Sequence, residues 1–154
     1  MKYLVDGHNL IPKVPGMSLQ NVDDELQLIE VLQVFCRVRR QAVEVFFDQA
    51  PPGMSGRRQV GVVVAHFVRQ GRTADEAIVA RLDQLGRSAQ NWTVVTSDRQ
   101  VQSEARAHQA RLVSSEQFAA DLMEALQQAQ TSQSGNHDKM SEDELNDWLK
   151  LFGG

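Results

Sequence analysis

Short β-branched runs alternate with longer helical patterns along this chain, and that alternation constrains the fold more than any other feature of the sequence. Strand-like runs occur at Tyr3–Val5, Val43–Phe47, Val60–Ala65, Trp92–Thr96 and, more weakly, Arg111–Val113. Near-continuous apolar strands that alternate with helices are typical of a mainly parallel sheet with helices on both faces. We therefore expect an α/β fold: a three-layer sandwich with a central, mainly parallel sheet.

Helical patterns fill most of the intervals between these runs. Apolar residues at helical spacing predict helices over about Val22–Arg40, after Thr73, from near Asp98, and from Ser114 or Ser115 through Leu126. The interval from Gln49 to Arg58 lacks this spacing and contains Pro-Pro-Gly and a second glycine, so it is predicted to be a mobile loop.

The length of 154 residues fits one main domain followed by a short tail. We assign residues 1–129 to the main domain, residues 130–140 to a polar linker and residues 141–154 to a C-terminal amphipathic helix. The tail helix is predicted from a capping-box pattern and from one apolar face, which comprise Ser141, Glu144, Leu145, Trp148, Leu149 and Phe152.

Charge and cysteine content narrow the class of protein. The net charge of −4 argues against a protein that coats nucleic acid by bulk electrostatics. The single cysteine, Cys36, permits neither an intrachain disulfide nor a cysteine-based zinc site, so we expect a cytoplasmic protein. No signal peptide is recognisable and no apolar run approaches the roughly 20 residues that span a bilayer, so we expect no membrane partner.

Acidic side chains come directly after predicted strands or open a predicted helix. Asp6 ends the first strand, Asp48 the second and Asp98 the fourth, whereas Asp75 and Glu76 open a helix. The carboxyl ends of parallel strands share one edge of the sheet, where ligands bind at the point at which the strand order reverses. Carboxylates crowded there repel one another unless a cation neutralises them, and oxygen-rich clusters suit Mg²⁺ or Mn²⁺. The sequence therefore predicts an acidic metal site that acts on a phosphate group.

These residues also have structural interpretations. Asp at a strand end is a common helix N-cap, and Asp98 has that pattern. Asn9 is expected either to hydrogen-bond the loop backbone or to orient Asp6 and a phosphate. Gly7 is expected to let the backbone turn sharply.

Basic and histidine side chains near the acids give weaker signals. Four arginines are candidates for phosphate contacts, with solvated surface charge as the alternative: Arg57, Arg58, Arg69 and Arg72. His8 is expected to be merely exposed, and His66 to be a strand-end residue without a chemical role.

A resemblance to a known family rests on four segments, which read LVDGHNLI, VEVFFDQA, TADEAI and VVTSDRQVQ in chain order. Together they resemble the NYN-domain nucleases, specifically the YacP-like branch, which have a PIN-like fold. The resemblance covers residues 2 to about 126. It implies an endoribonuclease, dependent on Mg²⁺ or Mn²⁺, that hydrolyses RNA phosphodiester bonds.

The resemblance also implies roles for individual residues. The catalytic acids would be Asp6, Asp75 and Asp98, and the metal ligands would be these three and Asp48. The supporting residues would be Asn9, Thr96 and Ser97. Glu76 is counted with them because it lies beside Asp75, and the RNA-binding candidates, Arg57, Arg58, Arg69 and Arg72, come from their positions in the sequence and not from the resemblance. Gln102 matches a position that the family often fills with glutamine, whereas His8 stands where the family commonly has tyrosine.

Other classes of protein fit less well. A P-loop enzyme is excluded because the chain has no Gly-rich loop ending in Lys-Ser or Lys-Thr. A phosphoaspartyl enzyme would need a strand-end lysine, and none is found. The remaining alternative is a non-catalytic RNA-binding or regulatory protein with a PIN-like fold, against which the intact set of acids argues. The sequence leaves open the RNA target, the choice between Mg²⁺ and Mn²⁺, the involvement of the ribosome or another ribonucleoprotein, and the oligomeric state.

Overall fold

The computed structural model describes residues 2–17, 24–50 and 53–134, with side chains as far as residue 130. Its elements follow the order β1 (Lys2–Asp6), α1 (Gly7–Leu10), η1 (Ile11–Lys13), α2 (Asp24–Arg39), β2 (Ala42–Ala50), β3 (Gly56–Val60), β4 (Val63–Arg69), α3 (Ala74–Leu85), η2 (Gly86–Asn91), β5 (Trp92–Val95), α4 (Arg99–Ala107), β6 (Arg111–Val113) and α5 (Ser115–Ser134).

The described strands form a six-stranded sheet in the order β3-β4-β2-β1-β5-β6. β1 pairs in parallel with β2 on one side and with β5 on the other. β4 and β6 extend the sheet in parallel, and β3 runs antiparallel to β4 at one edge. The chain therefore adds β2, β4 and β3 on one side of β1 and then β5 and β6 on the other. The carboxyl end of β1 is the point at which the strand order reverses.

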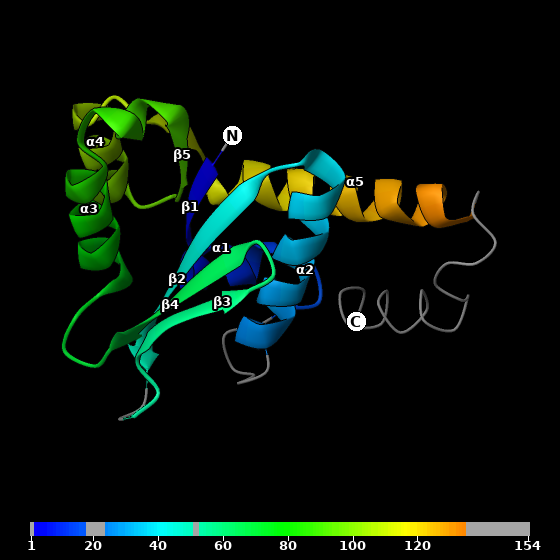
Figure 1. Cartoon of the computed structure of the whole chain (residues 1–154), viewed down its shortest axis with the longest axis horizontal. Helices are drawn as coiled ribbons and strands as arrows, with labels where there is room; N and C mark the ends of the chain where they lie inside the picture. Colours follow the sequence, from blue (N-terminus) through cyan, green and yellow to red (C-terminus); the bar gives the residue numbers. More distant parts are fainter. Residues whose placement is uncertain (1, 18–23, 51–52, 135–154) are drawn as a thin grey trace.

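Helices cover both faces of this sheet, with α2 and α5 on one face and α3 and α4 on the other (Figure 1). Alternate residues of β1 enter the two cores. Val5 packs into the core that contains Leu32 and Phe118, whereas Leu4 packs into the core that contains Ile78. Burial of each such side chain contributes roughly 1.5–3 kcal/mol. The prediction of a three-layer α/β sandwich is confirmed.

The apolar run Val60–Ala65 is not one strand, as the sequence pattern predicted, but a hairpin. β3 ends at Val60 and β4 begins at Val63. Gly61 makes the turn with a φ of 61°, a backbone angle that residues with a side chain rarely adopt. A Cβ at this position would also lie 2.9 Å from the Gln33 side-chain nitrogen. The valines around Gly61 hid this turn because they continue the strand-like composition on both sides.

The predicted loop from Gln49 to Arg58 is also shorter than expected. β2 continues through Ala50, and β3 begins at Gly56, so Arg57 and Arg58 lie on a strand. Residues 51–52 lie outside the described residues. Pairing with β4 orders the end of this interval, and the composition of β3 alone carries no strand signal.

The helices follow the predicted order, with differences at their ends. α3 and α4 begin after Thr73 and Asp98 as predicted. α2 is described from Asp24, so the predicted start at Val22 lies outside the described residues. α5 continues through Ser134, past residue 130, where the polar linker was predicted to begin. The predicted tail helix, residues 141–154, lies outside the described residues. Within the described chain, none of the helices has the length and apolar character needed to cross a bilayer.

Candidate active site

Asp6 occupies the point at which the strand order reverses. It is the last residue of β1 and the N-cap of α1, and its carboxyl group accepts a hydrogen bond from the Asn9 backbone N–H at 3.4 Å. Only 6% of its surface is exposed, because its strand lies in the middle of the sheet. Burial of a carboxyl group among other acids costs stability, and such groups gather at functional sites.

Gly7 is required for close packing, not for a sharp turn, which corrects the expectation from the sequence. Its φ is not positive, and a Cβ at this position would lie 2.4 and 2.6 Å from ring carbons of Phe47. The Phe47 side chain is fully buried and cannot easily move. We expect Gly7→Ala to lower the free energy of unfolding by about 1–3 kcal/mol, the usual cost of overpacking a core. Urea denaturation measures this change. A double variant with Phe47→Leu should recover part of the loss, and equal loss in both variants would contradict the packing explanation.

Asp48 lies within β2, close to its end, at an irregularity of the sheet. The pairing of β2 with β4 shifts between Phe47 and Ala50, and Gln49 has a φ of 62°. Such a bulge changes the direction of neighbouring side chains. The Asp48 carboxylate lies 2.7 Å from Nδ1 of His8. The bulge therefore holds this acid at the tip of the strand, beside the end of β1.

His8 joins Asp48 to the first turn of α2. Its Nδ1 lies 2.7 Å from Asp48 Oδ1, and its Nε2 lies 2.6 Å from Glu25 Oε2. A ring that faces a carboxylate at each nitrogen donates from both and carries a positive charge. The hydrogen bond to Glu25 raises the pKa of His8; burial opposes this rise, and Asp48 reinforces it. The expectation of a merely exposed His8 is wrong, because the sequence gives no sign that Glu25, 17 residues away, would meet it.

Asp75 and Asp98 come from the starts of two helices on the same face of the sheet. Asp75 lies in the first turn of α3, whose N-cap is Thr73. Asp98 caps α4, and its Oδ1 accepts the N–H groups of Gln100 at 2.9 Å and Val101 at 3.1 Å. The structural interpretation of Asp98 as an N-cap is thus confirmed. The cap does not exclude the other interpretation, because the same carboxylate also lies against Asp75.

The acids affect one another's protonation. Burial, followed by the charge of Asp75, raises the pKa of Asp6 to about 7, and Asp48 adds to this rise. Burial and then the charge of Asp98 raise the pKa of Asp75, against a hydrogen bond with Asp6 that lowers it. Asp6 is therefore the group that keeps a proton shared with Asp75. Asp75 interacts with each of the other three acids, and Asp6 also interacts with Asp48. We refer to Asp6, Asp48, Asp75 and Asp98 as the acid cluster.

Asn9 connects three segments around this cluster. Its side-chain oxygen accepts hydrogen bonds from the Ser97 backbone N–H at 2.9 Å and from the Ser115 hydroxyl. The Ser115 N–H donates in turn to Ser97 Oγ at 3.2 Å, and Ser97 Oγ donates to Glu116 at 2.7 Å. These bonds fix the end of β1, the loop after β5 and the start of α5 relative to one another. Sequence reasoning missed Ser115, because a serine at a helix start is ordinarily only a cap.

The other supporting candidates divide into two groups. The buried Thr96 accepts the Asp98 N–H at its Oγ1, at 3.0 Å, and its carbonyl oxygen accepts from the Gln102 side chain at 3.0 Å. Both contacts hold the loop that presents Asp98. Glu76 instead forms a capping box with Thr73: its N–H donates to Thr73 Oγ1 at 3.1 Å, and its carboxylate accepts the Thr73 hydroxyl at 3.3 Å. Its contacts therefore stabilise α3.

The donor chemistry of the acid cluster fits a hard divalent cation. Carboxylate oxygens are the ligands that Mg²⁺ and Mn²⁺ prefer, and a cation would offset the repulsion that raises the pKa of Asp6. Among the described residues, no three acidic, histidine or cysteine groups already surround one point as a metal site requires. Asp98 accepts two backbone N–H groups at Oδ1, and Oδ1 of Asp48 lies against His8. Metal binding would require rotation of these side chains and loss of the proton on Asp6.

The candidate arginines lie on two faces of the sheet. Arg57 pairs with His66 and Arg58 with Ala65, so their side chains leave β3 on opposite sides. Arg57 lines a pocket of about 390 Å³ together with Arg69 and Arg72. Arg58 lies over the Phe67 ring at 5.5 Å instead. Arg57 and Arg58 therefore face opposite sides of the sheet, because neighbours on a strand alternate between faces, and their contacts with RNA stay a prediction.

Arg72 connects this pocket to the acid cluster. It also lines a second pocket, of about 610 Å³, which contains Asp75 and Gln100 between α3 and α4. Basic and acidic surfaces thus adjoin at the start of α3.

Comparisons with known proteins agree with this fold. Two crystal structures of Rae1 (YacP) from Bacillus subtilis match with a TM-score of 0.74. The structure of a Trp-to-Leu mutant has 21% sequence identity and covers 98% of this chain and 91% of that chain. The other has 22% identity and covers 88% of this chain and 80% of that chain. No curated protein matched the sequence significantly.

These structural matches are distant in sequence, so they establish the fold alone. A family-level match adds to them: the family described as the YacP-like NYN domain matches residues 3–151. This range includes every member of the acid cluster, and the family suggests a ribonuclease. The chain belongs to the YacP-like NYN domain family.

Proposed function

We propose that this chain is a metal-dependent endoribonuclease, a hydrolase of RNA phosphodiester bonds whose site is the acid cluster. Asp6, Asp75 and Asp98 would be the catalytic acids, and Asp48 would join them as ligands of Mg²⁺ or Mn²⁺. The observation that carries the proposal is the buried Asp6, whose pKa rises to about 7 through burial and the neighbouring Asp75. If the residue served only to cap the helix, asparagine would do so as well as aspartate, without the cost of burying a carboxyl group beside another acid.

The surrounding residues have separate tasks in this mechanism. When bound, a divalent ion would supply positive charge that stabilises the transition state of an in-line displacement at phosphorus and activates water. His8 holds Asp48 from one side, and Thr96 holds the backbone of Asp98 from another. Asn9 fixes the end of β1 against the loop after β5. Together these contacts fix the elements that carry the acids, and the carboxyl groups would turn toward the ion when it binds.

RNA is the proposed partner, and arginines are its proposed phosphate contacts. Arg57, Arg69 and Arg72 line one pocket beside the acid cluster. Arg58 faces the α2 side of the sheet, so it would contact a different part of the RNA. The single Cys36 is buried and free, which suits the reducing cytoplasm that we propose as the location.

Cleavage assays test the proposal directly. The full chain, purified free of contaminating nuclease, would be incubated with a mixed pool of single-stranded RNA in Mg²⁺, in Mn²⁺ and in EDTA. We expect internal cleavage with either metal and none in EDTA, because the acids cannot stabilise the reacting phosphate alone. Cleavage that continues unchanged in EDTA would refute the metal-dependent mechanism. RNA binding without cleavage in any condition would favour the alternative of a non-catalytic RNA-binding protein.

A further inference from the structure

The pocket beside the acid cluster contains more than arginines. We define the arginine pocket by Arg57, Arg69, Arg72, Arg81, Phe46 and His66, which line its volume of about 390 Å³. This volume falls in the usual range for sites that take one small organic group. The pocket lies between the β3–β4 edge of the sheet and α3.

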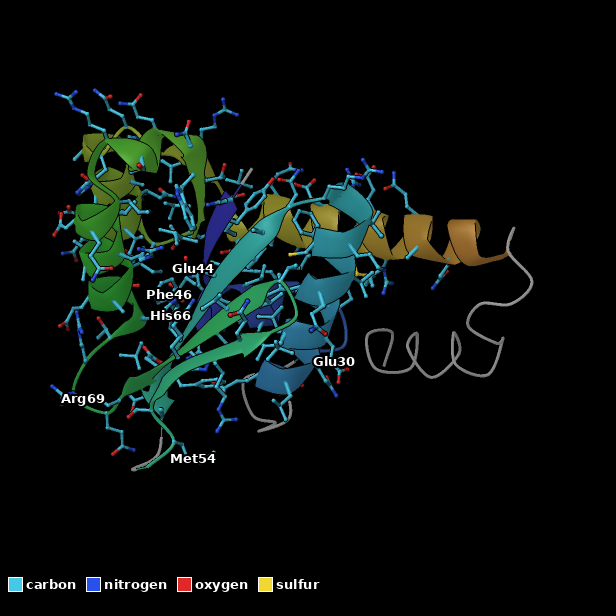
Figure 2. All side chains as sticks on the ribbon, viewed as in Figure 1. Glu30, Glu44, Phe46, Met54, His66 and Arg69 are labelled. Carbon is cyan, nitrogen blue, oxygen red and sulfur yellow. The ribbon has the colours of Figure 1, made fainter. Side chains whose placement is uncertain are left out.

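An aromatic surface forms one wall of the arginine pocket. His66 stacks on Phe46 with ring centroids 4.4 Å apart and planes only 13° from parallel. Figure 2 shows Glu44, Phe46 and His66 close together on the α3 side of the sheet, with Arg69 farther along toward the end of β4. Phe46 covers one face of the imidazole ring, Arg57 is the cross-strand neighbour on the other side, and 24% of the His66 side chain stays exposed. The His66 ring therefore contributes a flat aromatic surface to the lining of the arginine pocket.

Hydrogen bonds hold this ring in place. His66 Nε2 lies 2.8 Å from Glu44 Oε1, and Arg81 binds both oxygens of the same carboxylate at 3.0 and 2.9 Å. Burial opposes ionisation of Glu44, but the bonds from His66 and Arg81 outweigh it and lower its pKa to about 2. Because Glu44 is ionised, the proton on His66 sits at Nε2. These bonds fix the orientation of His66, which lies within β4, not at a strand end as the sequence predicted.

The remaining cations of the pocket have no such partner. Arg81 is neutralised by Glu44, whereas Arg57, Arg69 and Arg72 make no ion pair with any described residue. Three unneutralised guanidinium groups beside an aromatic face form a combination that suits a phosphate attached to a planar base. An acidic peptide would satisfy the charges but would leave the stacking surface unused.

We propose that the arginine pocket binds one unstacked nucleotide of single-stranded RNA, with its base against His66 and its phosphate held by Arg57, Arg69 and Arg72. This inference rests on the proposed function in taking RNA as the ligand. It adds that the site selects single-stranded over double-stranded RNA, because a paired base cannot stack on His66. Arg72 borders both pockets, so this nucleotide lies next to the one that meets Asp75.

Binding measured without metal separates this proposal from catalysis. Fluorescence anisotropy would follow the full chain in EDTA with a short labelled oligonucleotide, once single-stranded and once as a duplex. We expect His66→Ala to weaken single-strand binding by roughly 5- to 100-fold, the range for loss of one base-stacking contact. His66→Phe keeps a flat ring and should bind within about 3-fold of the wild type. The double variant Arg69→Ala/Arg72→Ala should lower the salt slope by about 1.4, because two phosphate contacts are lost.

Matched controls come from the carboxyl ends of α3 and α4. His108 pairs with Asp83 through a similar contact of 2.7 Å, and Arg87 and Arg106 are exposed outside the pocket. His108→Ala and Arg87→Ala/Arg106→Ala should leave binding unchanged. Any one of four results would overturn the proposal. These are equal loss of RNA affinity in the control variants, unchanged affinity in His66→Ala, equal loss of duplex affinity, and competition by polyglutamate as strong as that by RNA. Binding with the expected pattern but no cleavage in Mg²⁺ would instead refute the nuclease function and leave this site standing.

Discussion

Replacing Asp6 or Asp98 with asparagine should lower RNA cleavage by at least about 100-fold while the protein stays folded. A neutral amide is a poor ligand for a hard cation, and loss of several kcal/mol of charge stabilisation in the transition state corresponds to this factor or more. The fold should survive because asparagine caps helices as well as aspartate does, and both residues are N-caps. Initial cleavage rates at saturating Mg²⁺, with circular dichroism as the check on folding, measure the effect.

A carboxylate outside the acid cluster provides the control for this experiment. Asp121 lies on α5 and accepts a hydrogen bond from Gln117 at 3.1 Å. Asp121→Asn makes the same chemical change and should cleave at the wild-type rate. If Asp6→Asn and Asp98→Asn both retained full activity, the acid cluster could not be the catalytic site.

In the metal-free protein, Asp6→Asn should raise the free energy of unfolding, and the gain should grow as the pH rises. The pKa of Asp6 is about 7 in the folded protein but about 3.9 when unfolded, so the folded state holds a proton that the unfolded state has lost. The protonated carboxyl group therefore makes its full contribution to the free energy of unfolding below pH 4. This contribution is lost as the pH rises toward and through 7. Asparagine has no proton to lose. The stability difference between variant and wild type should therefore increase by roughly 2–4 kcal/mol between pH 4.5 and 8.

Urea denaturation in EDTA at several pH values measures this difference. Asp121→Asn should show a difference that stays flat with pH, because Asp121 lies outside the acid cluster. Addition of Mg²⁺ at pH 8 should stabilise the wild type more than Asp6→Asn, since only the wild type keeps all four carboxylates. A pH-independent difference for Asp6→Asn would show that the carboxyl group is already ionised in the metal-free fold.

The sequence predicted the architecture and the acids well because both follow local rules. β-branched runs marked β1, β2 and β5, and parallel strands bring their carboxyl ends to one edge, so Asp6 and Asp98 could be placed without coordinates. The hairpin at Gly61 could not be predicted in this way, since uniform valine composition conceals a turn that depends on one backbone angle.

Contacts between distant segments account for what the sequence did not predict at the site. Glu25 contacts His8, and Ser115 contacts Asn9, which lies 106 residues away in the sequence. The local sequence around His8 or Asn9 does not indicate these partners. The opposite directions of Arg57 and Arg58 follow from strand alternation, but only after β3 is recognised as a strand. The stacked pair of Phe46 and His66 likewise requires the pairing of β2 with β4.

The central place of β1 in the sheet has a consequence for synthesis of the chain. Along the chain, β1 comes long before β5, which pairs with it, and Asp6 comes long before Asp98, so these segments can join only late in synthesis. Until then β1 lacks its second neighbour, Asn9 lacks Ser97, and the acids have not met. The site is therefore complete only once β5 has joined the sheet and the loop after it has reached Asn9.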